Sequence, residues 1–148
     1  GMEAGALAAL LEKKREDVRL FALLDTLEYL KRGGRISKTV AFAGGLLNIK
    51  PLITVEDGEV LVVGKARGAK QGMALLTEKL LSDGGINFDL PILLGYSGTD
   101  ASNLEKYRAD SREIWQGRGD TLPSTLLCSV IGTHTGPGVV AAACFKND

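Results

Sequence analysis

The chain has 148 residues with 18 basic and 18 acidic side chains, so its formal net charge is zero. Apolar residues make up 45% and charged residues 24%, which is typical of one soluble globular domain covering residues 1–148. The charge balance argues against nucleic-acid binding, which leaves a basic excess on a domain. No apolar run reaches the roughly 18 residues of a membrane span, so we expect no stable membrane insertion.

In chain order, the apolar spacing of the first third predicts three helices and one strand. Asp25 and Glu28 have the spacing of a helix-capping box, and a double glycine follows Arg32. We expect an amphipathic helix at 4–18, a buried strand at 19–24, a short helix at 25–32 and a second helix at 36–47.

A β-hairpin is the clearest local signal of the chain. Two β-branched runs, 49–55 and 60–63, flank Asp57 and Gly58, and Asp-Gly between such runs is typical of a tight hairpin turn. Beyond the hairpin we expect a helix at 69–81, a strand at 92–96, a helix at 103–116 and strands at 126–131 and 139–145.

These elements predict the fold class. About six strands with four or five helices, and hairpins at both ends of the set, argue against a purely parallel sheet. We therefore expect an α/β (α+β) two-layer sandwich, in which helices cover one face of a mixed sheet.

The residues of chemical interest exclude several functions. Nucleotide-binding motifs of the GxxxxGK[ST] and G-x-G-x-x-G types are absent. Cys128 and Cys144 lie among apolar residues, so we expect buried free thiols of a cytoplasmic protein. One histidine and two buried cysteines do not suffice for a typical zinc site, and we expect neither metal nor cofactor.

The segment 131–138, with the sequence IGTHTGPG, concentrates three glycines, a proline and the single histidine, His134. Glycine permits positive φ, and consecutive N–H groups in such a turn can bind an anion. This favours a rigid loop that grips a carboxylate or phosphate. The alternative, a tight connection between two strands with a merely hydrogen-bonded histidine, stays open on these residues alone.

Two arginines carry the same ambiguity. Arg35 follows the double glycine, where its guanidinium could meet an anion or form a surface ion pair. Arg67 lies between a predicted strand and a predicted helix. Phe42 and Leu46 of the 36–47 helix are core positions unless a cavity makes them ligand contacts.

Four motifs resemble the DegV family of bacterial fatty-acid-binding proteins in order and spacing. They are LEYLKRGGRIS at 27–37, LLNIKPLI at 46–53, DG at 57–58 and GTHTGPG at 132–138. The resemblance covers nearly the whole chain and concerns the second half of that family only. It implies that the chain is the C-terminal domain of a two-domain protein whose N-terminal domain is missing here.

The resemblance also implies a function. A long-chain fatty acid is expected between the two domains, with its tail in an apolar tunnel. The protein would present this fatty acid to a separate fatty acid kinase subunit, which phosphorylates the carboxylate. The chain itself would then be no enzyme, and half of the site would be missing. The expected ligand-binding residues are His134, Thr133, Thr135, Arg35, Gly132, Gly136, Phe42 and Leu46, and the expected kinase-facing residue is Arg67.

Two other functions compete with lipid binding. The first is an enzyme for a small anionic substrate with His134 as general base, although the sequence positions no partner carboxylate for it. The second is a docking module, in which Arg67 and the turn at 65–70 meet an acidic surface.

Overall fold

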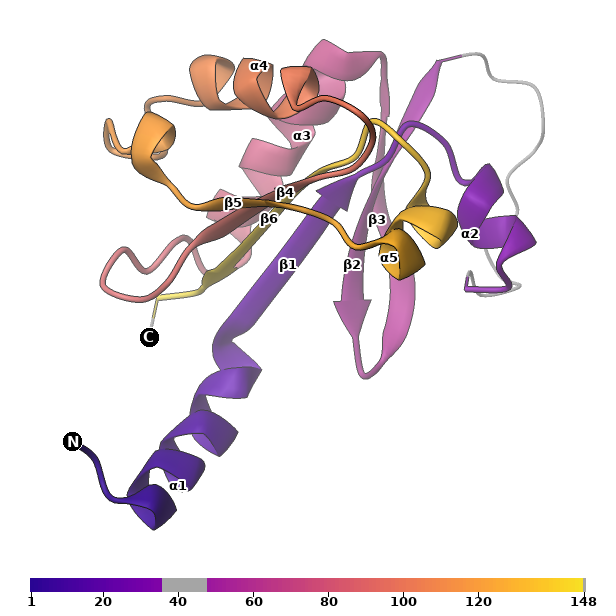
Figure 1. Ribbon diagram of the computed structural model, residues 1–148. Helices are drawn as coiled ribbons and strands as arrows, with labels where there is room; N and C mark the ends of the chain where they lie inside the picture. The colour runs from indigo at the N-terminus through magenta and orange to yellow at the C-terminus, as the bar shows by residue number, and fades with distance from the viewer. Residues whose placement is uncertain (36–47, 148) are drawn as a thin grey trace.

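A mixed six-stranded sheet forms the centre of the computed structural model, which describes residues 1–35 and 48–147 (Figure 1). Its strands are β1 Val18–Leu23, β2 Ile49–Glu56, β3 Glu59–Arg67, β4 Leu93–Tyr96, β5 Ser124–Leu126 and β6 Val140–Phe145. The strand order is β3-β2-β1-β6-β4-β5, and all neighbours are antiparallel except β4 and β5. The expected helix at 36–47, with Phe42 and Leu46, lies outside the described residues.

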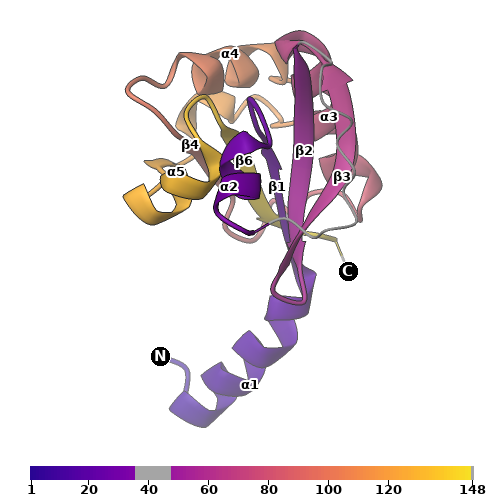
Figure 2. The same cartoon turned by 90° about the vertical axis from the view of Figure 1, so that its right-hand side faces the viewer.

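Helices lie on both sides of this sheet. They are α1 Ala4–Lys14, α2 Glu28–Arg32, α3 Ala69–Ser82, α4 Ser102–Asp110 and α5 Ser129–Thr135. The longer α3 and α4 cover one face, as the sandwich prediction requires, whereas the short α2 and α5 lie side by side over the other face (Figures 1 and 2). Helix α1 projects away from the sheet, and each of its residues is exposed or half-buried.

The core consists of two apolar clusters because successive strand residues point to opposite faces. Phe21 and Leu23 of β1 join the larger cluster under α3 and α4, while Ala22 joins the smaller one under α2. Met73, Leu76 and Leu80 repeat at helical spacing on the buried side of α3. The mixed α/β sheet with helices is therefore confirmed, and it leaves the face of α2 and α5 as a separate small layer.

The predicted hairpin is confirmed in detail. Asp57 and Gly58 have φ of 50° and 79°, so both central residues take the positive φ that a type I′ turn needs. Glu56 and Glu59 pair across the turn, and β2 and β3 continue from them.

The prediction of a strand at 126–131 is wrong. Strand β5 ends at Leu126, and α5 begins at Ser129. Since β5 pairs with β4 and not with β6, the second expected hairpin is also absent from the described sheet. The apolar residues of 126–131 suit a strand, but contacts with α2 select a helix here. Within it the hydroxyls of Thr133 and Thr135 donate to carbonyls four residues earlier, at 2.7 and 3.0 Å.

Three smaller expectations also need correction. Helix α4 ends at Asp110 rather than at 116, and a turn carries the chain onward. The carboxylate of Asp25 pairs with Lys50 instead of capping α2, whose first amide donates to the hydroxyl oxygen of Thr26. Cys128 is exposed, because it precedes the surface helix α5, while Cys144 is buried as expected.

The buried phenol of Tyr107 makes the free energy of unfolding depend on pH in the alkaline range. Burial raises its pKa from 10.0 to about 12, so the unfolded chain loses this proton at lower pH than the folded chain does. The stabilisation is fully present below pH 10 and is lost as the pH rises toward 12. We expect the free energy of unfolding to fall by about 2–3 kcal/mol across this window on account of Tyr107.

Urea denaturation at a series of pH values checks this expectation. The Tyr107→Phe variant is the control, because it keeps the ring and the titration of Cys144, whose pKa burial raises to about 11. Equal losses of stability in the parent and in Tyr107→Phe would contradict the assignment.

Candidate functional site

The C-terminal end of α2 explains the double glycine of the sequence. The amide of Arg35 donates to the carbonyl of Leu30 at 3.0 Å, and that of Gly34 donates to Lys31 at 3.2 Å, which is the Schellman pattern of helix termination. Gly34 has φ of 65°, the left-handed conformation that this cap requires. The cap turns the chain so that Arg35 leaves the helix at its exposed end.

Gly33 is the point where two predicted site residues meet. A Cβ atom at Gly33 would collide with Nδ1 of His134, so the imidazole rests directly on the Gly33 backbone. The guanidinium of Arg35 donates to the Gly33 carbonyl through Nη1 at 2.9 Å. The structure thus brings His134 of α5 and Arg35 together at the end of α2.

The two edges of the His134 ring have different surroundings. Nδ1 is buried and has no hydrogen-bond partner among residues 1–35 and 48–147. Because Nδ1 and Cε1 face Gly33 while the residue as a whole is half-buried, the accessible edge is the one that carries Nε2. Within the described part of the chain no carboxylate orients Nδ1, which weakens the hypothesis of a general base.

The backbone amides around His134 do not form the expected anion-binding turn. The Gly132 amide donates to Cys128 and the Gly136 amide to Gly132, both at 2.8 Å, as part of α5 and its end. The Gly138 amide donates to Ser97 at 3.0 Å. These donors are used inside the protein, so the charge near the site must come from side chains.

The two threonines flank His134 in different settings. Thr133 is exposed and Thr135 is buried. Each hydroxyl donates its hydrogen bond to a helical carbonyl, so it can only accept a further hydrogen bond. Neither is therefore a free donor for a carboxylate in this conformation of α5.

Positive charge surrounds the Gly33 junction. Lys31 and Arg32 occupy the last turn of α2 beside Arg35, and all three are exposed. Glu28 is the acidic neighbour on the same helix, 4.0 Å from Arg32. The balance of these charges favours an anion at this end of α2.

Sequence reasoning missed the residue that fixes the position of α5. The buried hydroxyl of Ser97 donates to the carbonyl of Gly136 at 2.6 Å and accepts from the amide of Val139 at 3.1 Å. Asn103 adds a bond from its side-chain amide to the Gly138 carbonyl at 3.2 Å. Because these partners lie about 35 to 42 residues away along the chain, no local pattern pointed to them.

Arg67 lies elsewhere in the molecule. It ends the edge strand β3 immediately before α3, and its backbone amide donates to the side chain of Gln71 at 3.3 Å. Helices α3 and α5 lie on opposite faces of the sheet, so Arg67 belongs to a different surface from His134 (Figure 2). Its side chain is exposed, as a residue that meets a partner must be.

The open mixed sheet thus carries His134 and Arg35 on either side of Gly33, at the end of α2. Within the described ranges, no three metal-binding side chains gather, and none of the helices is long and apolar enough to cross a membrane. The chain belongs to the DegV family, whose profile, described as that of uncharacterised DegV-family proteins, matches residues 1–147.

Known members of the family agree with this assignment. A DegV domain-containing protein of Clostridium acetobutylicum is 34% identical over 140 residues, 92% of this chain and 48% of that protein. The structure of a DegV family protein from Thermus thermophilus, described by its fatty acid binding, matches with a TM-score of 0.76 at 31% identity, over 99% of this chain and 52% of its own.

A third relative shows the fold alone. The fatty acid kinase B3 protein of Streptococcus pneumoniae, loaded with linoleic acid, matches with a TM-score of 0.79 at 19% identity, over 99% of this chain and 51% of that one. The chain thus spans about half the length of each of these three relatives.

Proposed function

We propose that this chain binds a long-chain fatty acid as one half of a two-domain site. The observation that carries the proposal is the junction at Gly33, which the imidazole of His134 and the guanidinium of Arg35 both contact beside a positively charged helix end. The Thermus thermophilus relative, described by its fatty acid binding, supports the choice of ligand.

The head group and the tail have separate roles in this proposal. A carboxylate removed from water needs hydrogen bonds or an opposite charge, which Nε2 of His134 and the side chain of Arg35 supply. A saturated tail of about sixteen carbons contributes on the order of 10 kcal/mol through burial, before the costs of association. We assign the tail to Phe42 and Leu46.

The segment around His134 forms a wall of the same site. Since the amides of Gly132 and Gly136 are engaged within the protein, these glycines shape the wall without donating to the ligand. The hydroxyls of Thr133 and Thr135 donate to helical carbonyls, so these threonines line the wall beside the carboxylate without donating to it. The remaining head-group donors come from the N-terminal domain of the same protein.

Uptake of palmitate by a delipidated two-domain protein tests the proposal. In that protein this chain follows the N-terminal half of a family member, and native mass spectrometry counts the bound ligand. We expect one fatty acid per chain, affinity about tenfold lower after His134→Ala, and no stoichiometric binding by the 148-residue chain alone. A folded two-domain protein that took up no palmitate would refute the proposal.

The second part of the proposal concerns a partner. A fatty acid kinase subunit phosphorylates the presented carboxylate, so that this chain is no enzyme itself, and Arg67 contacts that subunit. The name of the Streptococcus pneumoniae relative suggests the partner, and the exposed position of Arg67 on a second surface fits contact with an acidic protein.

Charge reversal separates docking from lipid binding. We expect Arg67→Glu to weaken association with the kinase subunit by about tenfold while palmitate affinity is retained, because a charge at the edge of an interface acts mainly on encounter. Lys13→Glu on the projecting helix α1 is the matched control. If Arg67→Glu lowered lipid affinity as well, Arg67 would be a ligand contact rather than a docking residue.

A further inference from the structure

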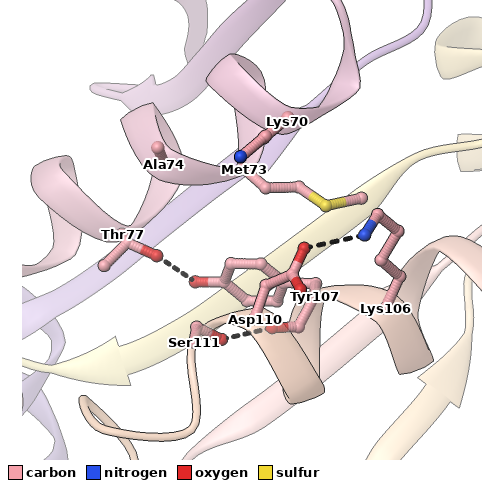
Figure 3. A pocket seen from close by; sticks show the side chains of 8 residues that line it. All are labelled: Lys70, Met73, Ala74, Thr77, Lys106, Tyr107, Asp110 and Ser111. Atoms are coloured by element: carbon pink, nitrogen blue, oxygen red, sulfur yellow. Dashed lines mark hydrogen bonds and ion pairs between the residues drawn. The ribbon is translucent and has the colours of Figure 1, made fainter.

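A cleft of about 500 Å³ separates α3 from α4 on the face of the sheet opposite to α2 and α5. It is therefore distinct from the His134 junction, and its size lies within the usual range for small-molecule sites. Figure 3 shows the side chains that face each other across it, among them Lys70, Met73 and Thr77 of α3 and Lys106, Tyr107 and Asp110 of α4.

The floor of the cleft is apolar. Met73 and the ring of Tyr107 are 4% and 0% exposed, and they belong to the main core cluster. A thioether and an aromatic ring together provide an adaptable surface for the body of a small ligand.

Above this floor, the hydroxyls of Thr77 and Tyr107 meet at 3.4 Å. The Thr77 hydroxyl donates to the phenol oxygen of Tyr107, and the Ser111 side chain is a second hydrogen-bond partner of that phenol. Tyr107 is fully buried whereas Thr77 is half-buried, so Thr77 carries the more accessible of the two hydroxyls.

The charges at the rim complete the pattern. Lys106 is paired with Asp110 at 3.0 Å, so the carboxylate of the cleft is already engaged. Lys70 on the opposite wall is exposed and forms no ion pair within the part of the chain that the structure describes. The cleft thus combines an unpaired ammonium group and a half-buried hydroxyl with an apolar floor.

We propose that the cleft between α3 and α4 binds a small organic oxyanion, a carboxylate or phosphate monoester carried on an apolar body. Lys70 supplies the charge, the hydroxyl of Thr77 supplies the hydrogen bond, and Met73 contacts the apolar body. This inference does not depend on fatty acid binding at His134.

Titration of the ¹⁵N-labelled chain with benzoate and with phenyl phosphate tests this site by two-dimensional NMR. The two probes share an apolar ring and differ in the oxyanion, so they distinguish the two classes of ligand. We expect saturable shifts in the amides of α3 and α4 below about 10 mM for at least one probe. Lys70→Gln should weaken this binding about tenfold, whereas Lys79→Gln, on the same helix outside the cleft, should not.

A second variant keeps the test decisive. Thr77→Val retains the shape of the side chain and removes the hydroxyl, and it too should weaken binding severalfold. The proposal is overturned if neither probe gives saturable shifts at α3 and α4, if the shifts centre on α5, or if both lysine variants weaken binding equally.

Discussion

Gly136→Ala is expected to lower the free energy of unfolding by about 3–5 kcal/mol and to disrupt the His134 junction. Gly136 has φ of 78° and ψ of −179°, a region of backbone conformation that only glycine adopts readily. A Cβ atom there would also overlap the ring of Tyr29, which packs from α2 against the end of α5. The backbone strain and the overlap with Tyr29 both disturb the packing of α5 against α2, which holds His134 over Gly33.

A double-mutant cycle separates the two costs. Tyr29 is 38% exposed, so Tyr29→Ala should be tolerated and should remove the obstacle to a Cβ atom. In that background Gly136→Ala should cost only the backbone part, about 1–3 kcal/mol by urea denaturation. Equal costs in both backgrounds would show that the Tyr29 contact plays no part.

Ser97→Ala is expected to lower the free energy of unfolding by about 2–4 kcal/mol, although Ser97 lies outside every motif of the sequence. Its buried hydroxyl bonds both the carbonyl of Gly136 and the amide of Val139. Removing it leaves two buried backbone groups unsatisfied, at about 1–3 kcal/mol each.

Ser82→Ala is the matched control for Ser97→Ala. The Ser82 hydroxyl is exposed and forms one long bond to a helical carbonyl at 3.4 Å, so its removal should cost less than about 0.5 kcal/mol. Thermal and urea denaturation measure both variants. If Ser97→Ala lowered the free energy of unfolding no more than the control does, the two hydrogen bonds of Ser97 would not stabilise the end of α5.

The elements that could be predicted are those whose signals are local. The turn at Asp57 and Gly58 is specified by two residues that accept positive φ, and α3 by apolar residues at 73, 76 and 80 on one side. The strand prediction for 126–131 failed because its apolar residues, Val130 and Ile131 among them, suit a strand, while long-range contacts of α5 with α2 select a helix.

The candidate site was only partly predictable for the same reason. His134 and Arg35 were identified from the motifs, yet the reason for their proximity is the absence of a side chain at Gly33, which sequence spacing does not reveal. Ser97 and Tyr29 were missed because both act on Gly136, which lies about forty residues from Ser97 and more than one hundred residues from Tyr29 along the chain. The expected turn of free amides failed because a helix uses them.

The imidazole resonance of His134 tests the central claim most directly, because His134 is the single histidine of this chain. The measurement uses the two-domain protein with ¹⁵N label confined to this half and titrates it with palmitate labelled with ¹³C at its carboxyl carbon. We expect the Nε2 resonance and the carboxyl resonance to shift together and to saturate at one ligand per chain. Stoichiometric palmitate binding with an unchanged His134 resonance would contradict the assignment of this residue to the carboxylate.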